Sequence, residues 1–531
     1  MLNQEKCNAH ERKAYFIGGG IASLAGAVFL IRDGGMDGRN IHILEDLGIN
    51  GGALDGIGSG NQDYVIRGGR MLNEPTYECT WNLLADIPSI DRPGKSVKDE
   101  IHDFTAQYPT HAKARLIDRT RQIVDVKHMG FSNEDRLDIS KLLIESEEDL
   151  GAKRINEWFS EHFFSTNFWY MWATMFAFQP WHSAVEFKRY MIRFMHEFHR
   201  IDTLAGVART PYNQYDSIVL PIQKWLEKQG VQYSLNTTVT DIDFAGDGSL
   251  RTAERIHYRQ ANHTGEILVS PEDMVFFTNG SMTENSDLGG MDRAPVLKDK
   301  GPSFGLWDKL SAKQPGFGNP AAFSNNITQS KWESFTVTCR NPLFFRRMEE
   351  FTGNEAGTGA LVTFKDSNWL MSVVLAHQPH FRNQPDDIQV FWGYGLTGDR
   401  KGNYVDKTMA ECTGAEILTE LCGHLRFMDD LPLLLETSDV IPCMMPFITS
   451  QFMPRVKGDR PDVVPEGSTN FAFLGQYTEI PEDVVFTVEY SVRSAMTAVY
   501  KLLNIEKDIP QPYKGQHSPK VLFESLVTAL R

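Results

Sequence analysis

The chain has 531 residues, which is too long for a single ordinary core and predicts two or three domains. Its 69 acidic and 53 basic residues give a net charge of -16, which argues against nucleic acid as the main partner because phosphate binding needs clustered cations. The 6 cysteines lie far apart without a C-x-x-C pair and the first residues are polar and charged. We therefore expect a cytoplasmic protein with no secretory signal, disulfide framework or metal site.

The first predicted elements are a strand, a glycine turn and a helix, which together form a pocket for a pyrophosphate. The apolar stretch 14–17 is typical of a strand, and the pattern over 24–31 predicts a helix. Gly18 permits a tight turn, and Gly20 lets the backbone close on the phosphates. Ala22 lies just before the predicted helix, whose dipole and free N–H groups favour the phosphate charge.

A second predicted strand, 41–44, delivers Glu45 to the place where a carboxylate binds the ribose hydroxyls. An acid there favours an unphosphorylated ribose, as in FAD or NAD. A glycine turn alone would be a weak signal, but strand, turn, helix, strand and acid occur here in order. The sequence therefore predicts a dinucleotide site and leaves the dinucleotide open.

The remaining pattern is that of an α/β protein, more broadly an α+β multidomain protein, in which a Rossmann-type sheet is completed after an insertion. We assign to this discontinuous dinucleotide-binding domain residues 12–130, 205–295 and 440–505. Residues 131–204 carry helical patterns and an aromatic block that we expect to wall an apolar cavity. Residues 296–439 predict a mixed α/β substrate-binding domain, and residues 506–531 form a tail with a short amphipathic helix.

The last predicted strand, 470–474, ends at Gly475 and precedes a helix predicted over 484–503. Proline and acids over 481–483 suit the first turn of that helix. Many flavoproteins close over the flavin with such a late strand, glycine and helix, although an ordinary C-terminal strand and helix has the same pattern.

Five segments in this order resemble the oleate hydratase family, also called myosin-cross-reactive antigens. The matching segments are 15–22, 66–70, 209–217, 278–281 and 475–493. The resemblance implies an FAD-binding hydro-lyase that adds water to the cis-9 double bond of a long-chain unsaturated fatty acid, typically oleate. The product is the 10-hydroxy acid, and the flavin undergoes no net redox change.

The resemblance also implies which residues hold FAD. The candidates are Gly18, Gly20, Ala22 and Glu45 for the pyrophosphate and ribose, Gly68, Gly69 and Arg70 for the isoalloxazine, and Asn279, Gly280, Ser281 and Gly475 elsewhere near the cofactor. For Arg70, the formation of a salt bridge is the alternative.

Hydration of an isolated alkene requires a proton donor at one carbon and an activated water on the opposite face at the next, inside a dry tunnel. By resemblance the donor is Tyr190, with a neighbouring positive charge to lower its pKa; the alternative is a buried aromatic whose hydroxyl is satisfied. Met71 replaces the water-activating glutamate of the best-known members, and methionine cannot accept a proton. Either flavin and backbone position the water, or Glu74 substitutes, or the reaction differs. Glu74 is otherwise a solvated loop acid.

The carboxylate end of the substrate also departs from the family pattern. Gln214 and His380 match residues that contact the carboxylate, but Val374 and Ala376 stand where threonine and asparagine are expected. Losing two donors from a buried site costs about 1 to 3 kcal/mol each if nothing replaces them. The headgroup is then held differently, or another chain length is preferred.

Three further questions stay open at this level. A flavin-dependent oxidase or isomerase, or a fatty acid and flavin binding protein with little catalysis, is the alternative to a hydratase. Monomer and homodimer are both compatible with the sequence. The apolar residues over 519–531 predict packing on their own domain, and peripheral contact with a membrane is a hypothesis.

Overall fold

The computed structural model describes residues 12–58, 63–246, 250–359 and 361–531. Its central element is a five-stranded parallel sheet with the strand order β19-β12-β1-β2-β8. The strands are β1 (Ala14–Ile17), β2 (Ile41–Leu44), β8 (Gln232–Ser234), β12 (Met274–Thr278) and β19 (Phe471–Leu474). The predicted α/β fold with a Rossmann-type sheet is confirmed.

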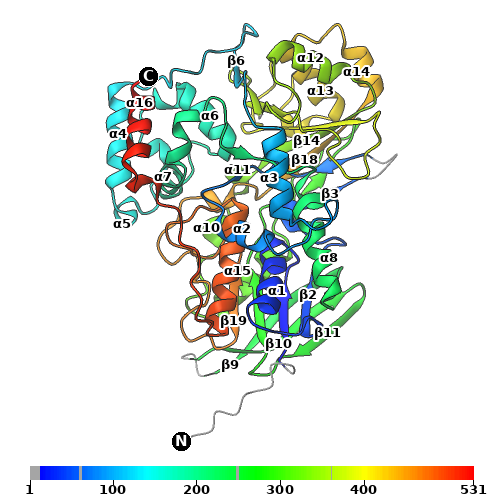
Figure 1. Cartoon of the computed structure of the whole chain (residues 1–531), viewed down its shortest axis with the longest axis vertical. Helices are drawn as coiled ribbons and strands as arrows, with labels where there is room; N and C mark the ends of the chain where they lie inside the picture. Colours follow the sequence, from blue (N-terminus) through cyan, green and yellow to red (C-terminus); the bar gives the residue numbers. More distant parts are fainter. Residues whose placement is uncertain (1–11, 59–62, 247–249, 360) are drawn as a thin grey trace, which may run out of the picture.

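Helices cover one face of this sheet. Figure 1 shows α1 (Ile21–Arg32) and α15 (Val488–Leu502) side by side, and both belong to the core that contains Phe16 and Phe276. α8 (Leu220–Lys228) packs against the other side of α1. The first and last parts of the chain therefore close one nucleotide-binding unit, because α15 returns to the helix that follows the first strand.

A β-meander covers the other face. It consists of β9 (Thr237–Ala245), β10 (Thr252–Gln260) and β11 (His263–Leu268). Together with α9 (Pro302–Lys313) it packs on the face that carries Tyr15 and Phe277. Because both faces are buried, β1, β12 and β19 are almost continuous apolar runs, whereas the edge strand β8 carries Gln232 and Ser234.

A second, seven-stranded sheet has the order β13-β18-β14-β17-β16-β15-β6. Its strands are β6 (Leu116–Ile117), β13 (Asp287–Leu288), β14 (Trp332–Cys339), β15 (Leu361–Phe364), β16 (Met371–Val374), β17 (Gln389–Gly395) and β18 (Ser438–Met445). Side chains of α12 (Leu343–Thr352) and α13 (Gly414–Leu425) form a separate core with this sheet. β6, β13 and most of β18 lie outside 296–439, so this sheet includes residues that the sequence analysis assigned to the dinucleotide-binding domain. The domain boundaries stay a proposal.

The segment 131–204 is helical, with an aromatic core. Its helices are α4 (Asn133–Ile144), α5 (Glu147–Leu150), α6 (Asn167–Phe176) and α7 (Ala184–Arg193). The tail helix α16 (Pro519–Leu530) packs on the turn η5 (Met195–Arg200), and Arg136 Nε of α4 donates to the Ala529 carbonyl at 2.7 Å. Figure 1 shows α16 in red beside α4.

The C-terminal helix begins later than the sequence predicts. α15 starts at Val488 with Thr487 as its N-cap, because the Thr487 side chain accepts from the N–H of Tyr490. Glu482 and Phe486 both have a left-handed backbone, with φ of 65° and 72°. Two such residues cannot lie in a right-handed helix, so the segment 481–487 forms a loop that leads into α15.

The described structure also bears on membrane-spanning helices and on the cysteines. Within the described ranges, no helix is both long and apolar enough to cross a membrane. Cys79, Cys339, Cys412, Cys422 and Cys443 are free and buried, and Cys7 lies outside the described residues.

Candidate functional site

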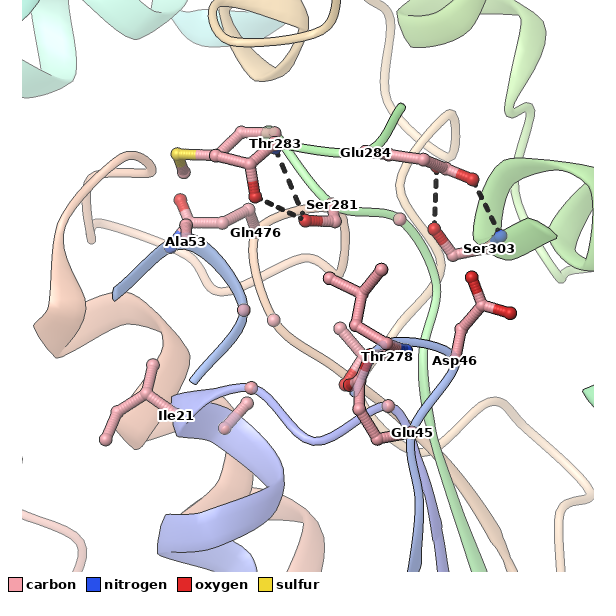
Figure 2. A pocket seen from close by; sticks show the side chains of 18 of the residues that line it. Ile21, Glu45, Asp46, Ala53, Thr278, Ser281, Thr283, Glu284, Ser303 and Gln476 are labelled. Atoms are coloured by element: carbon pink, nitrogen blue, oxygen red, sulfur yellow. Dashed lines mark hydrogen bonds between the residues drawn. The ribbon is translucent and has the colours of Figure 1, made fainter. Parts of the chain in front are cut away.

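A cavity of about 400 Å³ lies at the carboxyl end of the parallel sheet. Four strands end on it: Gly18 follows β1, Glu45 follows β2, Thr278 ends β12 and Gly475 follows β19. Figure 2 shows Ile21, Glu45, Ala53 and Ser281 approaching the cavity from separate segments. Open α/β sheets bind ligands at this edge, because the strand ends and the helix N-termini meet there.

The glycine loop exposes backbone to this cavity. Gly20 is the N-cap of α1, has no side-chain cap, and the first turn of α1 holds no acid. The first N–H groups of the helix are therefore available to an anion. Gly52 lies opposite, with a φ of 56°, and a Cβ added there would be 3.2 Å from Gly20 Cα. The two glycines form a narrow cradle of backbone.

Three carboxyl groups, those of Glu45, Asp46 and Glu284, line the same cavity. Glu45 accepts from the N–H of Gly19 at 2.5 Å and from the N–H of Leu47 at 2.8 Å, and burial raises its pKa. Glu284 accepts from the N–H and the hydroxyl of Ser303, as the dashed lines in Figure 2 mark. Burial raises the pKa of Glu284 to about 7.

The structure places most of the predicted cofactor residues around this cavity. Those that line it are Gly18, Gly20, Ala22, Glu45, Arg70, Gly280, Ser281 and Gly475. Asn279 lies behind the wall, where its Nδ2 donates to the Tyr477 carbonyl at 3.1 Å. Gly69 lines a second cavity, and Gly68 lines neither.

Residues from β9 and α9 also line the first cavity, and the sequence analysis did not single them out. They include Thr237, Thr238 and Val239 of β9 and Ser303 and Leu306 of α9. No short-range pattern marks them, because they reach the cavity only through the packing of the meander and of α9. Gly51 and Gly52, which also line the cavity, can be identified from the sequence, because a glycine pair follows the second predicted strand.

A second cavity, of about 100 Å³, adjoins the first and shares Arg70 and Phe486 with it. Its walls are largely apolar and aromatic: Met175, Leu361, Trp332, Trp392 and Tyr394. Among the described residues that line it there is no aspartate or glutamate. The sequence predicted an apolar cavity walled by the aromatic block, but the rings of Trp332 and Trp392 come from the second sheet.

Arg70 stands where the two cavities meet. Its guanidinium donates to the carbonyls of Gly69 and Ala53 at 3.2 and 3.3 Å and lies 5.4 Å from the ring centre of Phe486. No ion pair to Arg70 is found among the described residues, so the alternative of a salt bridge is not supported. Burial lowers its pKa to about 10, which leaves it cationic at neutral pH.

Tyr190 is fully buried and lines neither cavity. Its ring centre lies 4.7 Å from that of Phe176, and its hydroxyl donates to the backbone carbonyl of Val485. Burial raises its pKa well above the usual value, and Arg70 acts only weakly in the opposite direction. In this arrangement the pKa of the phenol is therefore not lowered, contrary to the condition set for a proton donor.

The wall between Tyr190 and the cavities is strained. Phe486, the residue after Val485, lines both cavities and has a φ of 72°, which costs a non-glycine residue about 1 to 3 kcal/mol. Such strain persists only where the surrounding structure fixes it, and it is common at functional sites.

The structure argues against Glu74 as the substitute base. Its side chain is 59% exposed, it lines neither cavity, and it pairs with His102 at 2.7 Å. Met71 lines the second cavity and packs in a small apolar cluster with Leu361 and Val374. The position of the expected glutamate is thus an apolar wall.

We expect Glu74→Gln to leave the rate of the reaction within about twofold of the original, because surface substitutions rarely act at a distance. The measurement is product formation under saturating substrate. A loss of tenfold or more would return Glu74 to the mechanism.

The four residues predicted for the carboxylate end do meet in the second cavity. Gln214, Val374, Ala376 and His380 all line it. The Gln214 side-chain amide lies 3.4 Å from the Arg70 carbonyl, and the His380 backbone is fixed by Asn213 and Gln384. Val374 and Ala376 have no side-chain hydrogen-bond donor. Two of the donors expected for the carboxylate are therefore absent from this cavity.

The MCRA family model matches residues 11–500. An oleate hydratase of Streptococcus pyogenes is 41% identical over 526 residues, covering 97% of this chain and 89% of that protein. A linoleate hydratase of Lactiplantibacillus plantarum is 37% identical over 557 residues, covering 97% of each. A putrescine oxidase variant with redesigned cofactor binding shares the fold, with a TM-score of 0.50 and 14% identity over 93% of this chain and 99% of that one.

Proposed function

This chain belongs to the MCRA family, and on that basis we propose that it is an FAD-dependent hydro-lyase. It adds water to the cis-9 double bond of a long-chain unsaturated fatty acid, converting oleate to 10-hydroxystearate without net redox change. The observation that carries this function is the junction at Arg70 and Phe486, where a glycine-lined cavity meets an apolar one. A dinucleotide and an alkyl chain would meet there.

The first cavity fits FAD. The cradle of Gly20 and Gly52 and the uncapped N-terminus of α1 suit a pyrophosphate, and Glu45 suits a ribose. Gly280 and Gly475 also line this cavity, and a Cβ at either position would press on the side chains behind it, those of Tyr477 and Thr278. When bound, FAD supplies a planar polar ring system that organises the reaction site.

The second cavity meets the demand for a dry tunnel. Met71, Leu361 and Trp392 exclude water from the alkyl chain and leave the double bond without competing nucleophiles. With no carboxylate in its described lining and Glu74 at the surface, we assign the positioning of the attacking water to the backbone around Gly69 and Arg70. In this mechanism without a carboxylate base, the proton that the water loses on attack replaces the proton that the phenol donates, so no net proton is consumed.

We assign the proton donor to Tyr190 on the strength of the family resemblance. Its hydroxyl must exchange the Val485 carbonyl for the substrate, which requires the strained segment at Phe486 to move. Hydrogen bonds of catalytic groups often reach their productive geometry only when ligands bind, and we propose that this holds for the Tyr190 hydroxyl.

We expect purified, FAD-loaded protein to convert oleate to a hydroxy acid that is heavier by one water, under reducing conditions. Water labelled with oxygen-18 should place the label in the product, and stearate, which has no double bond, is the matched control. Hydrogen peroxide formed in step with substrate loss would instead indicate an oxidase. Saturable binding with every cis-9 double bond left intact would indicate a lipid-binding protein.

The oligomeric state and the location of the protein are also proposals. We propose a cytoplasmic monomer or homodimer, which light scattering distinguishes. Leu522, Phe523 and Leu526 of α16 are exposed, which fits peripheral contact with a membrane. Unchanged liposome co-sedimentation after deletion of 519–531 would remove that contact.

A further inference from the structure

The charges around the second cavity are all of one sign. Two guanidinium groups, those of Arg70 and Arg209, line it together with His377 and His380. Within the described part of the chain, no acidic side chain lines it. An apolar cavity that carries cations and no counter-charge is suited to an amphipathic anion, because the anion replaces the missing partner.

The two arginines are held in different ways. Arg70 is tied to backbone carbonyls on both sides and stacks on Phe486, so its guanidinium belongs to the junction with the first cavity. Arg209 follows β7 (Val207–Ala208), and in the described structure its side chain donates only from Nε, to the Thr110 hydroxyl at 3.2 Å. The two terminal nitrogens of Arg209 are therefore available to a ligand.

The surroundings of Arg209 keep it charged and make its neighbour neutral. Burial lowers the pKa of Arg209 to about 10, so it is cationic at neutral pH. Burial, and then the charge of Arg209, lowers the pKa of His380 to about 4. At neutral pH His380 is thus a neutral hydrogen-bonding group beside a cation, which is an arrangement that binds a carboxylate without a second charge.

We propose that Arg209 binds the carboxylate of the fatty acid in this chain, with His380 beside it, and so replaces the donors missing at Val374 and Ala376. A planar guanidinium presents two parallel N–H groups to a carboxylate, which a threonine and an asparagine would otherwise supply singly. The enzyme then selects free fatty acids against neutral lipids of the same length. The identity of the ligand rests on the proposed function.

The test compares binding of an acid and an alcohol with the same chain to the FAD-loaded protein by calorimetry, below the micellar concentration. The ligands are oleate and oleyl alcohol, and stearate and stearyl alcohol. We expect Arg209→Gln to weaken oleate binding by about tenfold to a hundredfold, the range for a lost charged hydrogen bond. Binding of oleyl alcohol should change by less than about twofold, because the alkyl wall is intact.

Two further variants separate headgroup binding from folding and from general charge. Arg209→Lys retains the cation but not the two parallel N–H groups, so it should recover only part of the affinity for oleate. Arg346→Gln removes an exposed arginine of α12 that lines neither cavity and should change nothing.

Equal weakening of acid and alcohol by Arg209→Gln, unchanged oleate binding, or no binding of fatty acid by the unaltered protein would overturn the proposal. Stearate keeps this test apart from the hydratase activity, since it has no double bond. If Arg209→Gln selectively weakens stearate while oleate is never hydrated, the headgroup site stands and the proposed reaction fails.

Discussion

Tyr190→Phe is expected to lower the turnover of oleate by about a hundredfold, the usual scale for a lost general acid. The affinities for FAD and for oleate should stay within about threefold, because phenylalanine keeps the ring packing of the original residue. That packing includes Phe176 at 4.7 Å and Phe178 at 5.1 Å. Steady-state kinetics of the FAD-loaded protein gives the turnover, and titrations give both affinities.

Tyr394→Phe is the matched control, because Tyr394 is a buried phenol that does line the second cavity. Its hydroxyl donates to the Thr174 carbonyl, and burial raises its pKa, as for Tyr190. We expect Tyr394→Phe to retain turnover within about threefold and to lower stability by about 1 kcal/mol, the value of one hydrogen bond. The reverse pattern would transfer the proton donor to Tyr394 and reject the assignment made by resemblance.

Gly20→Ala is expected to weaken FAD binding by about tenfold to a hundredfold, since overpacking costs about 1 to 3 kcal/mol. The added Cβ enters the cradle, where its nearest neighbour outside the loop is Gly52 Cα at 3.9 Å. The fold itself should tolerate the methyl group, because Gly20 has an extended backbone with φ of -73°. Flavin fluorescence measures the affinity.

Gly305→Ala is the control for this substitution. Gly305 lies in α9, and a Cβ there meets nothing within 4 Å, so both stability and FAD affinity should be retained. The free energy of unfolding of the flavin-free Gly20→Ala protein should also stay within about 0.5 kcal/mol of the original. An unchanged FAD affinity in Gly20→Ala would place the pyrophosphate elsewhere.

The start of α15 is a feature that local sequence patterns predict wrongly. Proline and two acids over 481–483 are typical of a first helical turn, yet α15 begins only at Val488. Phe486 takes a left-handed backbone because its ring packs between the two cavities and its N–H donates to the Gln476 side chain. Those partners are tertiary, so no propensity of the segment itself reveals the conformation.

The sequence by itself determined the nucleotide-binding unit. Its signals are short in range: an apolar strand, glycines two residues apart, a helix and Glu45 at the end of the next strand, each fixed by backbone geometry within a few residues. The family resemblance added the reaction. Neither the short-range signals nor the resemblance indicates which of the named side chains lie in the same cavity.

Only the tertiary structure decided the composition of the second cavity. It turned Glu74 to solvent, set Tyr190 behind the wall and brought Arg209 beside His380. The residues of this cavity come from the seven-stranded sheet, the segment around Arg70, the helical segment and the loop before α15, which lie up to hundreds of positions apart in the chain. Their meeting depends on how whole elements pack, and packing of buried surfaces is a property of the complete fold.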